Sequence, residues 1–162
     1  MPKLNWTDQT DIRRRAWRVV TGTTLQMLAK TDEELQQATG LPLAEYDAML
    51  HTADAGGAGI RMTDLAEAVL LTKAGLTALI DRLEERGFVR REPDPDDRRV
   101  WRIVLTDEGE SVFREAAAVH VQSIENHFTS RITDEEAQVI VDALERAGAH
   151  LDEVHEPSDA RS

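Results

Sequence analysis

The sequence predicts a mostly α-helical protein with a small β-wing, built as a winged helix-turn-helix lobe flanked by terminal helices. Only 4% of its 162 residues are aromatic, and Ala, Leu and Val dominate the apolar ones, which favours helices over an all-β fold. The predicted elements run in the order helix, helix, helix, helix, hairpin, helix, helix. Two short helices joined by a tight turn and followed by a two-stranded hairpin are typical of a winged helix-turn-helix.

The first two predicted helices end at glycine and proline signals. Apolar residues at helical spacing predict one long helix over residues 7–37, with Thr21–Thr24 as a candidate break and Pro42 just beyond its end. A second helix is expected over residues 42–50. The three glycines within residues 54–59 predict a loop, because each glycine costs a helix interior about 1 kcal/mol relative to alanine.

The next two helices have candidate caps and the clearest amphipathic stripe. Thr63 is a candidate N-cap of a short third helix, and Thr72 of a fourth helix that ends at Gly87, where a left-handed residue is needed. The fourth helix places four apolar residues at positions i, i+3, i+4 and i+7, namely Leu76, Leu79, Ile80 and Leu83. One face of this helix is predicted to be buried and the opposite face exposed.

A hairpin and two further helices complete the predicted order. Residues 88–91 and 100–105 are predicted strands, and the second alternates apolar and polar residues. Residues 93–99 between them are rich in Pro and Asp, which predicts a turn-rich hairpin tip. Thr106 and Thr133 are candidate caps of the last two helices.

Net charge alone argues against binding to nucleic acid, but its distribution does not. The total of −12 is unfavourable for phosphate binding. The segment after Arg82 is comparatively basic, whereas nine carboxylates against two arginines follow from Asp134 onward. The arginines of the basic segment are Arg86, Arg90, Arg91, Arg98, Arg99 and Arg102. The chain also has no cysteine, which excludes disulfides, thiolate zinc sites and iron–sulfur clusters.

Three motifs in order resemble one family of bacterial regulators. They are the string Asp81-Arg82-Leu83-Glu84-Glu85-Arg86-Gly87-Phe88-Val89-Arg90-Arg91, then Asp97-Arg98-Arg99, then Leu105-Thr106-Asp107-Glu108-Gly109. Together they resemble the multiple antibiotic resistance regulator (MarR) family, most densely over residues 41–109. The resemblance implies a homodimer of winged-helix lobes that binds a pseudo-palindromic operator in double-stranded DNA. It also implies release by a small ligand, often phenolic or anionic.

The start of the fourth helix is the predicted recognition surface. A recognition helix enters the major groove with its N-terminal turns, which here expose Thr72, Lys73, Ala74 and Thr77. Lysine and threonine can reach base edges or phosphates, and the methyl groups can contact thymine. The alternative is a set of small surface residues without a ligand. Arg82 is expected either to contact a phosphate or to pair with Glu85 or Asp81.

The wing supplies the second predicted contact with DNA. Arg98 and Arg99 lie at the hairpin tip next to Asp96 and Asp97, and arginine suits the negative potential of a narrow minor groove. By resemblance, Arg99 is the arginine of the family's Asp-x-Arg motif and Asp97 orients it. The alternative is a solvated turn held by surface ion pairs.

Apolar residues outside the lobe predict a dimer. We expect an N-terminal dimerisation helix over residues 1–42, the DNA-binding lobe over 43–109, C-terminal dimerisation helices over 110–154 and a frayed tail over 155–162. An intramolecular helical bundle is the alternative. The interface is expected to use Ile12, Trp17 and Val20 with Val112, Phe113, Ala116, Val119, Ile124, Phe128, Ile132, Val139, Ile140, Leu144 and Leu151.

An effector pocket is expected between the first two helices and the lobe, by resemblance to the family. Its candidate lining residues are Arg14, Trp17, Arg18, Tyr46 and His51, with an arginine meeting an anionic ligand. The alternative role of Trp17 and Tyr46 is plain core packing. No metal is expected, since the five histidines lack a close pair at i, i+4, and no cofactor is expected.

These patterns predict a sequence-specific transcriptional regulator, and more specifically a repressor, of cytoplasmic location. No apolar run is long enough to span a bilayer, and the first residues do not have the order of a signal peptide. The alternative function is a winged-helix module for protein–protein contact without DNA binding. An enzyme is not expected, because no catalytic constellation or phosphate-binding loop is placed convincingly.

Overall fold

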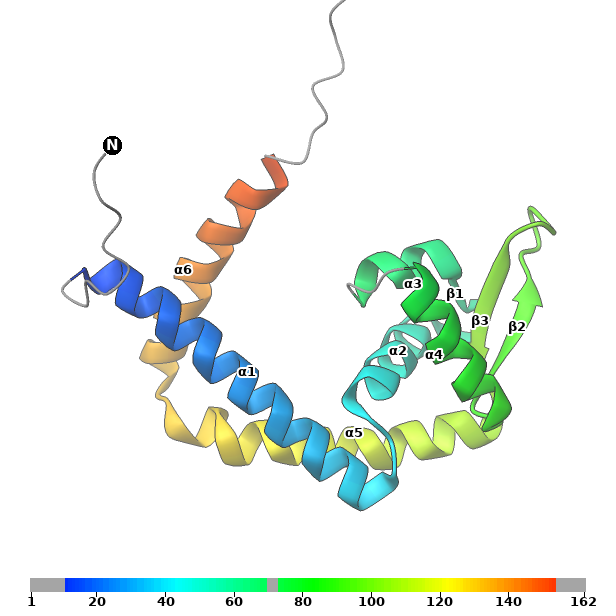
Figure 1. Ribbon diagram of the computed structural model, residues 1–162, viewed down its shortest axis with the longest axis horizontal. Coiled ribbons are helices and arrows are strands. Elements are labelled where there is room, and N and C mark those ends of the chain that lie inside the picture. The colour runs from blue at the N-terminus through cyan, green and yellow to red at the C-terminus, as the bar shows by residue number, and fades with distance from the viewer. Residues whose placement is uncertain (1–10, 70–72, 154–162) are drawn as a thin grey trace, which may run out of the picture. The chain divides into compact units, whose positions relative to one another are not determined.

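The computed structural model describes residues 11–69 and 73–153, and the chain divides into two compact units. The first unit ends at Ser123 and the second begins at Ile124, so helix α5 (Asp107–His127) belongs to both. In the first unit, helices α2, α3 and α4 gather beside a small sheet whose hairpin projects past them (Figure 1). Within the described residues, no helix is long and apolar enough to cross a membrane.

Helix α1 (Ile12–Thr39) is continuous, so the break considered at Thr21–Thr24 is wrong. The hydroxyl of Thr21 donates to the carbonyl of Trp17 at 2.8 Å, which satisfies this side chain inside the helix. Asp11 caps the N-terminus by accepting from the amide of Arg13, and Gly40 ends the helix at φ 68°. The predicted start at Thr7 lies outside the described residues.

The segment after α2 (Leu43–Asp54) holds more structure than the predicted loop. A 3₁₀ turn, η1 (Gly56–Ala58), leads into a two-residue strand, β1 (Ile60–Arg61), and then directly into α3 (Met62–Ala68). The prediction of Thr63 as N-cap is wrong, because the strand runs straight into the helix and Arg61 occupies the cap position. Thr63 instead donates its hydroxyl to Asp64 at 3.0 Å.

Helix α4 (Lys73–Glu85) buries the predicted stripe. Leu76, Leu79, Ile80 and Leu83 are at most 2% exposed. Gly87 adopts φ 76°, and the amide of Phe88 donates to the carbonyl of Leu83 at 2.9 Å, which closes the helix as predicted. The predicted cap Thr72 lies outside the described residues.

The wing belongs to a three-stranded antiparallel sheet in the order β1-β3-β2, not to the isolated two-stranded hairpin that was predicted. Strand β2 (Val89–Pro93) pairs with β3 (Trp101–Leu105) from Val89↔Leu105 to Pro93↔Trp101, and β1 pairs with β3 through Ile60↔Ile103. Gly59 allows this approach, since its φ is 68° and a Cβ there would lie 2.5 Å from the carbonyl oxygen of Ile103.

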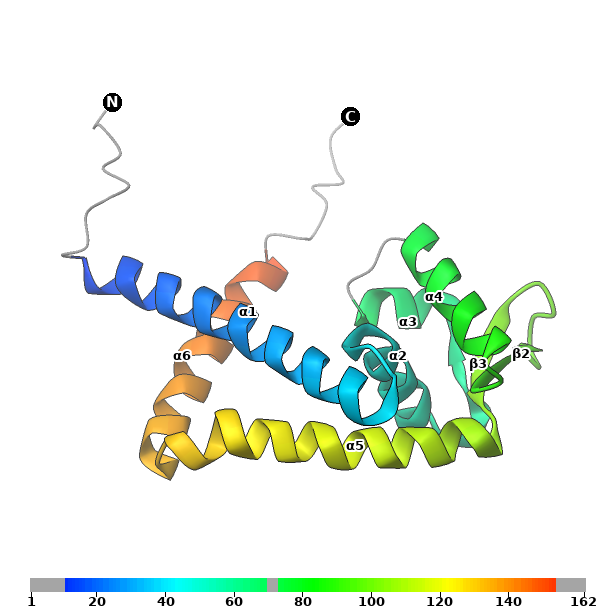
Figure 2. The same ribbon diagram turned by 60° about the horizontal axis from the view of Figure 1, so that its bottom comes forward.

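The first half of α5 runs beneath α2 (Figure 2) and closes the core of the first unit. Thr106 caps α5 as predicted, accepting from the amide of Gly109 at 2.9 Å. A Cβ on Gly109 would lie 1.9 Å from the carbonyl oxygen of Phe88, so glycine permits this packing. The core of the lobe consists of Leu35, Leu41, Tyr46, Ala48, Met49, Leu65, Leu76, Leu79, Ile80, Leu83, Phe88, Val89, Ile103 and Ala116.

The second unit holds a 3₁₀ turn, η2 (Thr129–Arg131), and helix α6 (Asp134–Glu153). Thr133 caps α6 as predicted, in a reciprocal capping box. Its amide donates to the carboxylate of Glu136 at 2.9 Å, and its hydroxyl accepts from the amide of Glu136 at 3.3 Å.

Candidate nucleic-acid interface

The exposed face of α4 is the first part of the candidate interface. Thr77 is exposed on this helix, on the side opposite the buried leucines. Lys73 and Ala74 lie in its first turn, but their side chains are outside the described part of the chain, as is the whole of Thr72. Of the four predicted contacts at the start of α4, Thr77 is thus the one whose exposure the structure describes.

A buried carboxylate fixes α4 against α2. Glu45 is 4% exposed, and it accepts from Arg82 Nε at 3.1 Å and from Arg86 Nη1 at 2.7 Å. Arg86 also lies over the ring of Phe88 at 4.6 Å and donates to the carbonyl of Gly40. Pairing with Glu85 or Asp81 was one of the two alternatives expected for Arg82, the other being a phosphate contact. Arg82 instead pairs with Glu45, which approaches from a different helix.

Two exposed arginines stand at the tip of the wing. The side chain of Arg99 is 91% exposed, and Arg98 is exposed as well. Asp97 accepts from the amide and Nε of Arg99 at 3.0 and 3.1 Å, and from its Nη2 at 3.3 Å. These hydrogen bonds hold the pKa of Asp97 below its usual value. The carboxylate therefore limits the directions in which Arg99 can point.

The base of the wing is organised by Asp94, a residue that sequence reasoning treated only as part of the turn. Its side chain is fully buried and accepts from Nε of Arg61 and Nε of Arg102, each at 2.8 Å. It also accepts from the amides of Asp96 and Asp97 at 2.9 and 3.3 Å. The hydrogen bond from Arg61, followed by that from the amide of Asp96, holds the pKa of Asp94 far below its usual range.

This anchor connects the wing tip to the remainder of the sheet. Arg102 also donates through Nη1 to the carbonyls of Ala58 and Gly59, at 3.2 and 3.1 Å. The tip, β1 and β3 therefore share one network. The only signal in the sequence was the spacing of Asp94 from the amides two and three residues later, which is typical of an Asx turn.

A cavity of about 500 Å³ lies beside the first turns of α2, and we call it the Tyr46 cavity. Of the five residues predicted to line an effector pocket, only Tyr46 does so. Trp17 is 70% exposed on α1, and Arg14 and Arg18 are exposed on the same helix. On α2, Nε2 of His51 lies 3.8 Å from Oδ1 of Asp47. The lining residues are Leu28, Asp32, Leu43, Ala44, Tyr46, Asp47, Leu50, Val69 and His120.

An aromatic stack forms one wall of the Tyr46 cavity. The ring of Tyr46 stacks on that of Phe113, with the ring centroids 5.7 Å apart, and contacts the ring of His120, with the centroids 4.7 Å apart. Burial raises the pKa of the Tyr46 hydroxyl and lowers that of the His120 imidazole, so both groups are favoured in their neutral forms. His120 was not among the residues predicted to line the effector pocket, because it lies far from Tyr46 in the chain.

An amphipathic helix, here α4, held beside a β-hairpin wing that carries arginines is typical of the class of winged-helix transcriptional regulators. The sequence profile described as the MarR family matches residues 39–100. Transcriptional regulator HosA from Escherichia coli O111:H- is 33% identical over 136 residues, which cover 83% of this chain and 96% of that protein. The chain belongs to the MarR family.

Solved structures agree with this assignment. AbsC, a MarR family transcriptional regulator from Streptomyces coelicolor, matches with a TM-score of 0.80 and 30% identity, over 87% of this chain and 95% of that chain. Sco3205, a MarR family regulator from the same organism solved in complex with DNA, matches with a TM-score of 0.79 and 29% identity. That match covers 90% of this chain and 92% of that chain.

Proposed function

We propose that the protein is a repressor that binds a pseudo-palindromic operator as a homodimer, in the cytoplasm, and is released from DNA by a small ligand. The first turns of α4 enter the major groove with Thr72, Lys73, Ala74 and Thr77, and the wing places Arg98 and Arg99 in the minor groove. The observation that carries the proposal is Arg99, which Asp97 holds at the wing tip with its side chain 91% exposed.

The pairing pattern of the arginines supports this assignment of the wing. Arg82, Arg86 and Arg102 contact buried carboxylates. Arg91 pairs with both Asp81 and Glu84. Among the described residues, Arg99 pairs only with the half-exposed Asp97, so its guanidinium remains open to a second acceptor such as a base edge or a phosphate. Arg82 keeps a 55% exposed side chain and stays a candidate phosphate contact.

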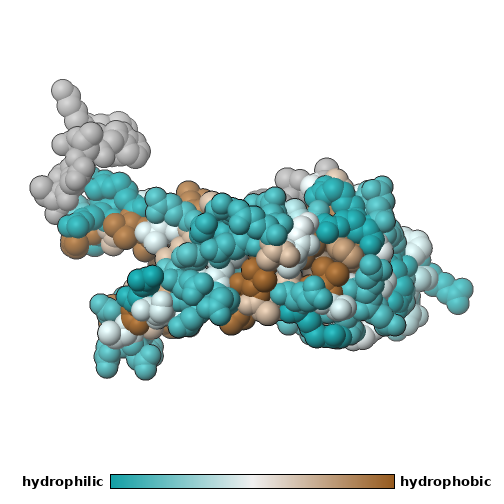
Figure 3. Space-filling model, turned by 90° about the horizontal axis from the view of Figure 1, so that it is seen from below, coloured by the Kyte–Doolittle hydropathy of each residue, from teal (hydrophilic) through white to brown (hydrophobic). Residues whose placement is uncertain are grey.

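Exposed apolar side chains support the homodimer. On α1, Ile12 and Trp17 are about 70% exposed, and Val139 on α6 is 68% exposed. Apolar patches also appear among hydrophilic residues on the face seen in Figure 3. Part of the expected interface is used otherwise, since Val112, Phe113, Ala116 and Val119 pack against the core of the lobe. The proposed interface therefore rests on α1 and α6, and the two-fold would place two α4 helices about one DNA turn, ~34 Å, apart.

The Tyr46 cavity is the proposed effector site. Its volume suits a small organic ligand, and its lining is mostly apolar with Tyr46, His120 and two carboxylates, Asp32 and Asp47, as polar groups. A phenolic ring can stack within the aromatic wall while its hydroxyl meets one of these groups. Because Asp32 also accepts from the amide of Leu43 at 2.7 Å, a ligand there contacts the joint between α1 and α2.

The wing assignment is tested by measuring fluorescence anisotropy of DNA from upstream of the protein's own gene. Arg99→Ala is expected to weaken binding by about 5- to 100-fold and to flatten the salt dependence, as loss of a groove contact does. Arg114→Ala, which removes a 70% exposed arginine from α5, is the matched control and leaves binding unchanged.

Two outcomes would contradict the proposal. If the wild-type protein fails to bind at low salt, the alternative of a protein–protein module is favoured. If Arg99→Ala binds with unchanged affinity and unchanged salt dependence, the wing does not contact DNA. A thermal-shift screen of phenolic and anionic metabolites, followed by DNA release, tests the effector site separately.

A further inference from the structure

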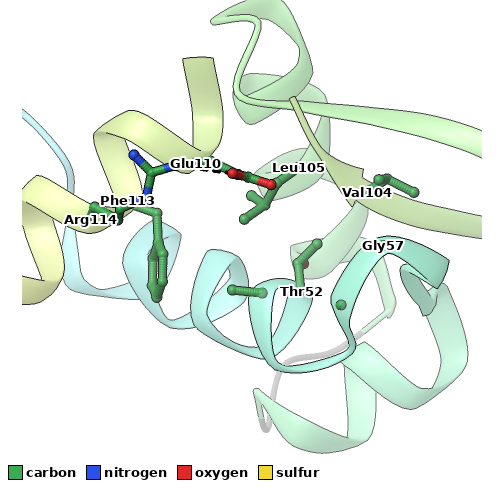
Figure 4. Close-up of a pocket in the computed structure, with 9 residues that line it drawn as sticks. Thr52, Gly57, Val104, Leu105, Glu110, Phe113 and Arg114 are labelled. Atoms are coloured by element: carbon green, nitrogen blue, oxygen red, sulfur yellow. Dashed lines mark hydrogen bonds and ion pairs between the residues drawn. The ribbon is translucent and has the colours of Figure 1, made fainter. Parts of the chain in front are cut away.

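A second cavity, which we call the Phe113 cavity, lies between the end of α2, η1, β3 and the first turns of α5 (Figure 4). Its volume is about 280 Å³, roughly nine times the ~30 Å³ that one water occupies in the liquid, so it has room for a monocyclic ligand. It shares no residue with the Tyr46 cavity. Its lining residues are Thr52, Ala53, Gly56, Gly57, Val104, Leu105, Glu110, Phe113 and Arg114.

Two glycines of η1, Gly56 and Gly57, line this cavity, and the fold requires only the first of them. Gly56 has φ 67°, so the turn after α2 needs glycine there. Gly57 has an ordinary φ, and a Cβ built on it meets nothing within 4 Å. The backbone of η1 would therefore accept a side chain at residue 57. Because Gly57 lines the cavity, a side chain added there would stand at the cavity wall.

The walls combine an apolar slot with a carboxylate. Val104, Leu105 and the ring of Phe113 are apolar (Figure 4). The ring of Phe113 also stacks on Tyr46, with the ring centroids 5.7 Å apart. Glu110 lies at the edge of the slot, with one oxygen 3.1 Å from Arg114. An aromatic ring fits such a slot, and its charged substituent would meet the edge.

Charge decides which substituent is favoured. Among the described lining residues, Arg114 is the one basic side chain, and it is 70% exposed. Glu110 is the lining carboxylate; Asp107 and Glu108 share the first turn of α5 with it, and Asp54 follows the lining residue Ala53. A cation can replace Arg114 on Glu110, because an exposed i, i+4 pair contributes little. An anion could displace Glu110 from Arg114 in the same way, so the preference for a cation rests on Asp107 and Glu108, the further carboxylates in the first turn of α5.

We propose that the Phe113 cavity binds a small aromatic cation, an arylalkylamine or arylamidine, with its ring on Phe113 and its cationic group on Glu110. This site is additional to the Tyr46 cavity, and its failure would leave the proposed DNA binding and effector release untouched. Its walls include β3, which carries Arg102, and η1, whose last residue Ala58 accepts from Arg102 through its carbonyl, as does the next residue, Gly59. An occupant therefore contacts the elements that carry the wing.

The test is an NMR titration of the ¹⁵N-labelled full-length protein with three ligands of like size and different charge: benzylamine, benzyl alcohol and benzoate. Benzylamine is expected to shift the amide signals of Gly56 and Gly57 with saturation. Benzoate should bind at least about tenfold more weakly, the ratio expected for one charge-assisted hydrogen bond. Glu110→Gln should remove the preference for the amine, and this exposed substitution leaves the fold intact.

Filling the cavity gives an independent check. Gly57→Leu is expected to abolish the benzylamine shifts, whereas Gly22→Leu on α1, where a Cβ also meets nothing within 4 Å, should retain them. Thermal unfolding of both variants establishes that they fold. The proposal is overturned if none of the three ligands saturates or if benzoate binds as tightly as benzylamine. It is equally overturned if benzylamine shifts Tyr46 and His120 instead of Gly56 and Gly57, or if Gly57→Leu binds unchanged.

Discussion

Replacing Glu45 with glutamine tests whether one buried carboxylate positions the recognition helix. The substitution keeps the shape of the side chain but removes the charge that Arg82 and Arg86 contact at 3.1 and 2.7 Å. Removing one partner of a buried ion pair costs about 3–5 kcal/mol. The side chains of Arg82 and Arg86 are 55% and 35% exposed, so water replaces part of the lost interaction. We expect a loss of about 1–2 kcal/mol in the free energy of unfolding.

Two assays separate an effect on the stability of the protein from an effect on the position of α4. Urea unfolding is measured at a fixed protomer concentration and gives the free energy of unfolding, because the stability of the proposed dimer would depend on concentration. Operator binding is measured where the variant is fully folded, so a three- to tenfold loss of affinity, about 0.6–1.4 kcal/mol, would report a shift of α4 and not unfolding.

Glu110→Gln is the matched control, since Glu110 forms a surface pair with Arg114 on a single helix. Its expected cost is about 0.5 kcal/mol or less. If Glu45→Gln costs no more than this control and binds the operator as tightly as the wild type, Glu45 does not position α4.

Three further predictions concern the base of the wing and the packing of the lobe. The pKa of Asp94 in the folded protein lies far below its usual range, so its contribution to stability is fully present above about pH 4 and is lost as the pH falls toward the folded pKa. In urea unfolding measured at several pH values, Asp94→Asn should therefore weaken the dependence of stability on pH in the acid range. An unchanged dependence would contradict the network around Asp94. Gly59→Ala should lower stability by about 1–3 kcal/mol, because its φ is 68° and its Cβ would meet the carbonyl of Ile103, while Gly57→Ala, read in the same thermal melts, should be nearly neutral. Thr31→Val should lower the free energy of unfolding by about 1–3 kcal/mol, because the buried hydroxyl of Ser123 loses the hydroxyl partner that lies 3.0 Å away. The double variant Thr31→Val/Ser123→Ala should be more stable than Thr31→Val alone.

Features set by neighbouring residues were predictable from the sequence. The buried stripe of α4, the left-handed Gly87 and the capping by Thr106 follow from periodicity and from the conformational preferences of single residues. The family motifs added the pairing of Asp97 with Arg99 at the wing tip. None of these predictions required knowledge of which segments meet in space.

The missed features depend on partners distant in the chain. Arg61 and Asp94 are 33 residues apart, and Glu45 and Arg86 are 41 apart, so neither pair produces a local pattern. Strand β1 has two residues, too few for alternation, and it exists because β3 offers it an edge. Trp17 and Tyr46 were both expected to line the effector pocket by resemblance to the family, but Trp17 lies exposed on α1 and Tyr46 is buried within an aromatic stack.

The carboxylate partners of the lobe's arginines affect how the protein finds its site in a genome. Attraction to DNA of random sequence depends almost entirely on positive charge that is not neutralised within the protein. Here Glu45 and Asp94 each form ion pairs with two arginines, and the chain as a whole carries a charge of −12. A genome offers roughly 10⁶–10⁹ competing sites, so weak adhesion to all of them keeps more molecules free to meet the operator. Occupancy of the operator would then depend mainly on shape and base contacts, and only slightly on bulk charge.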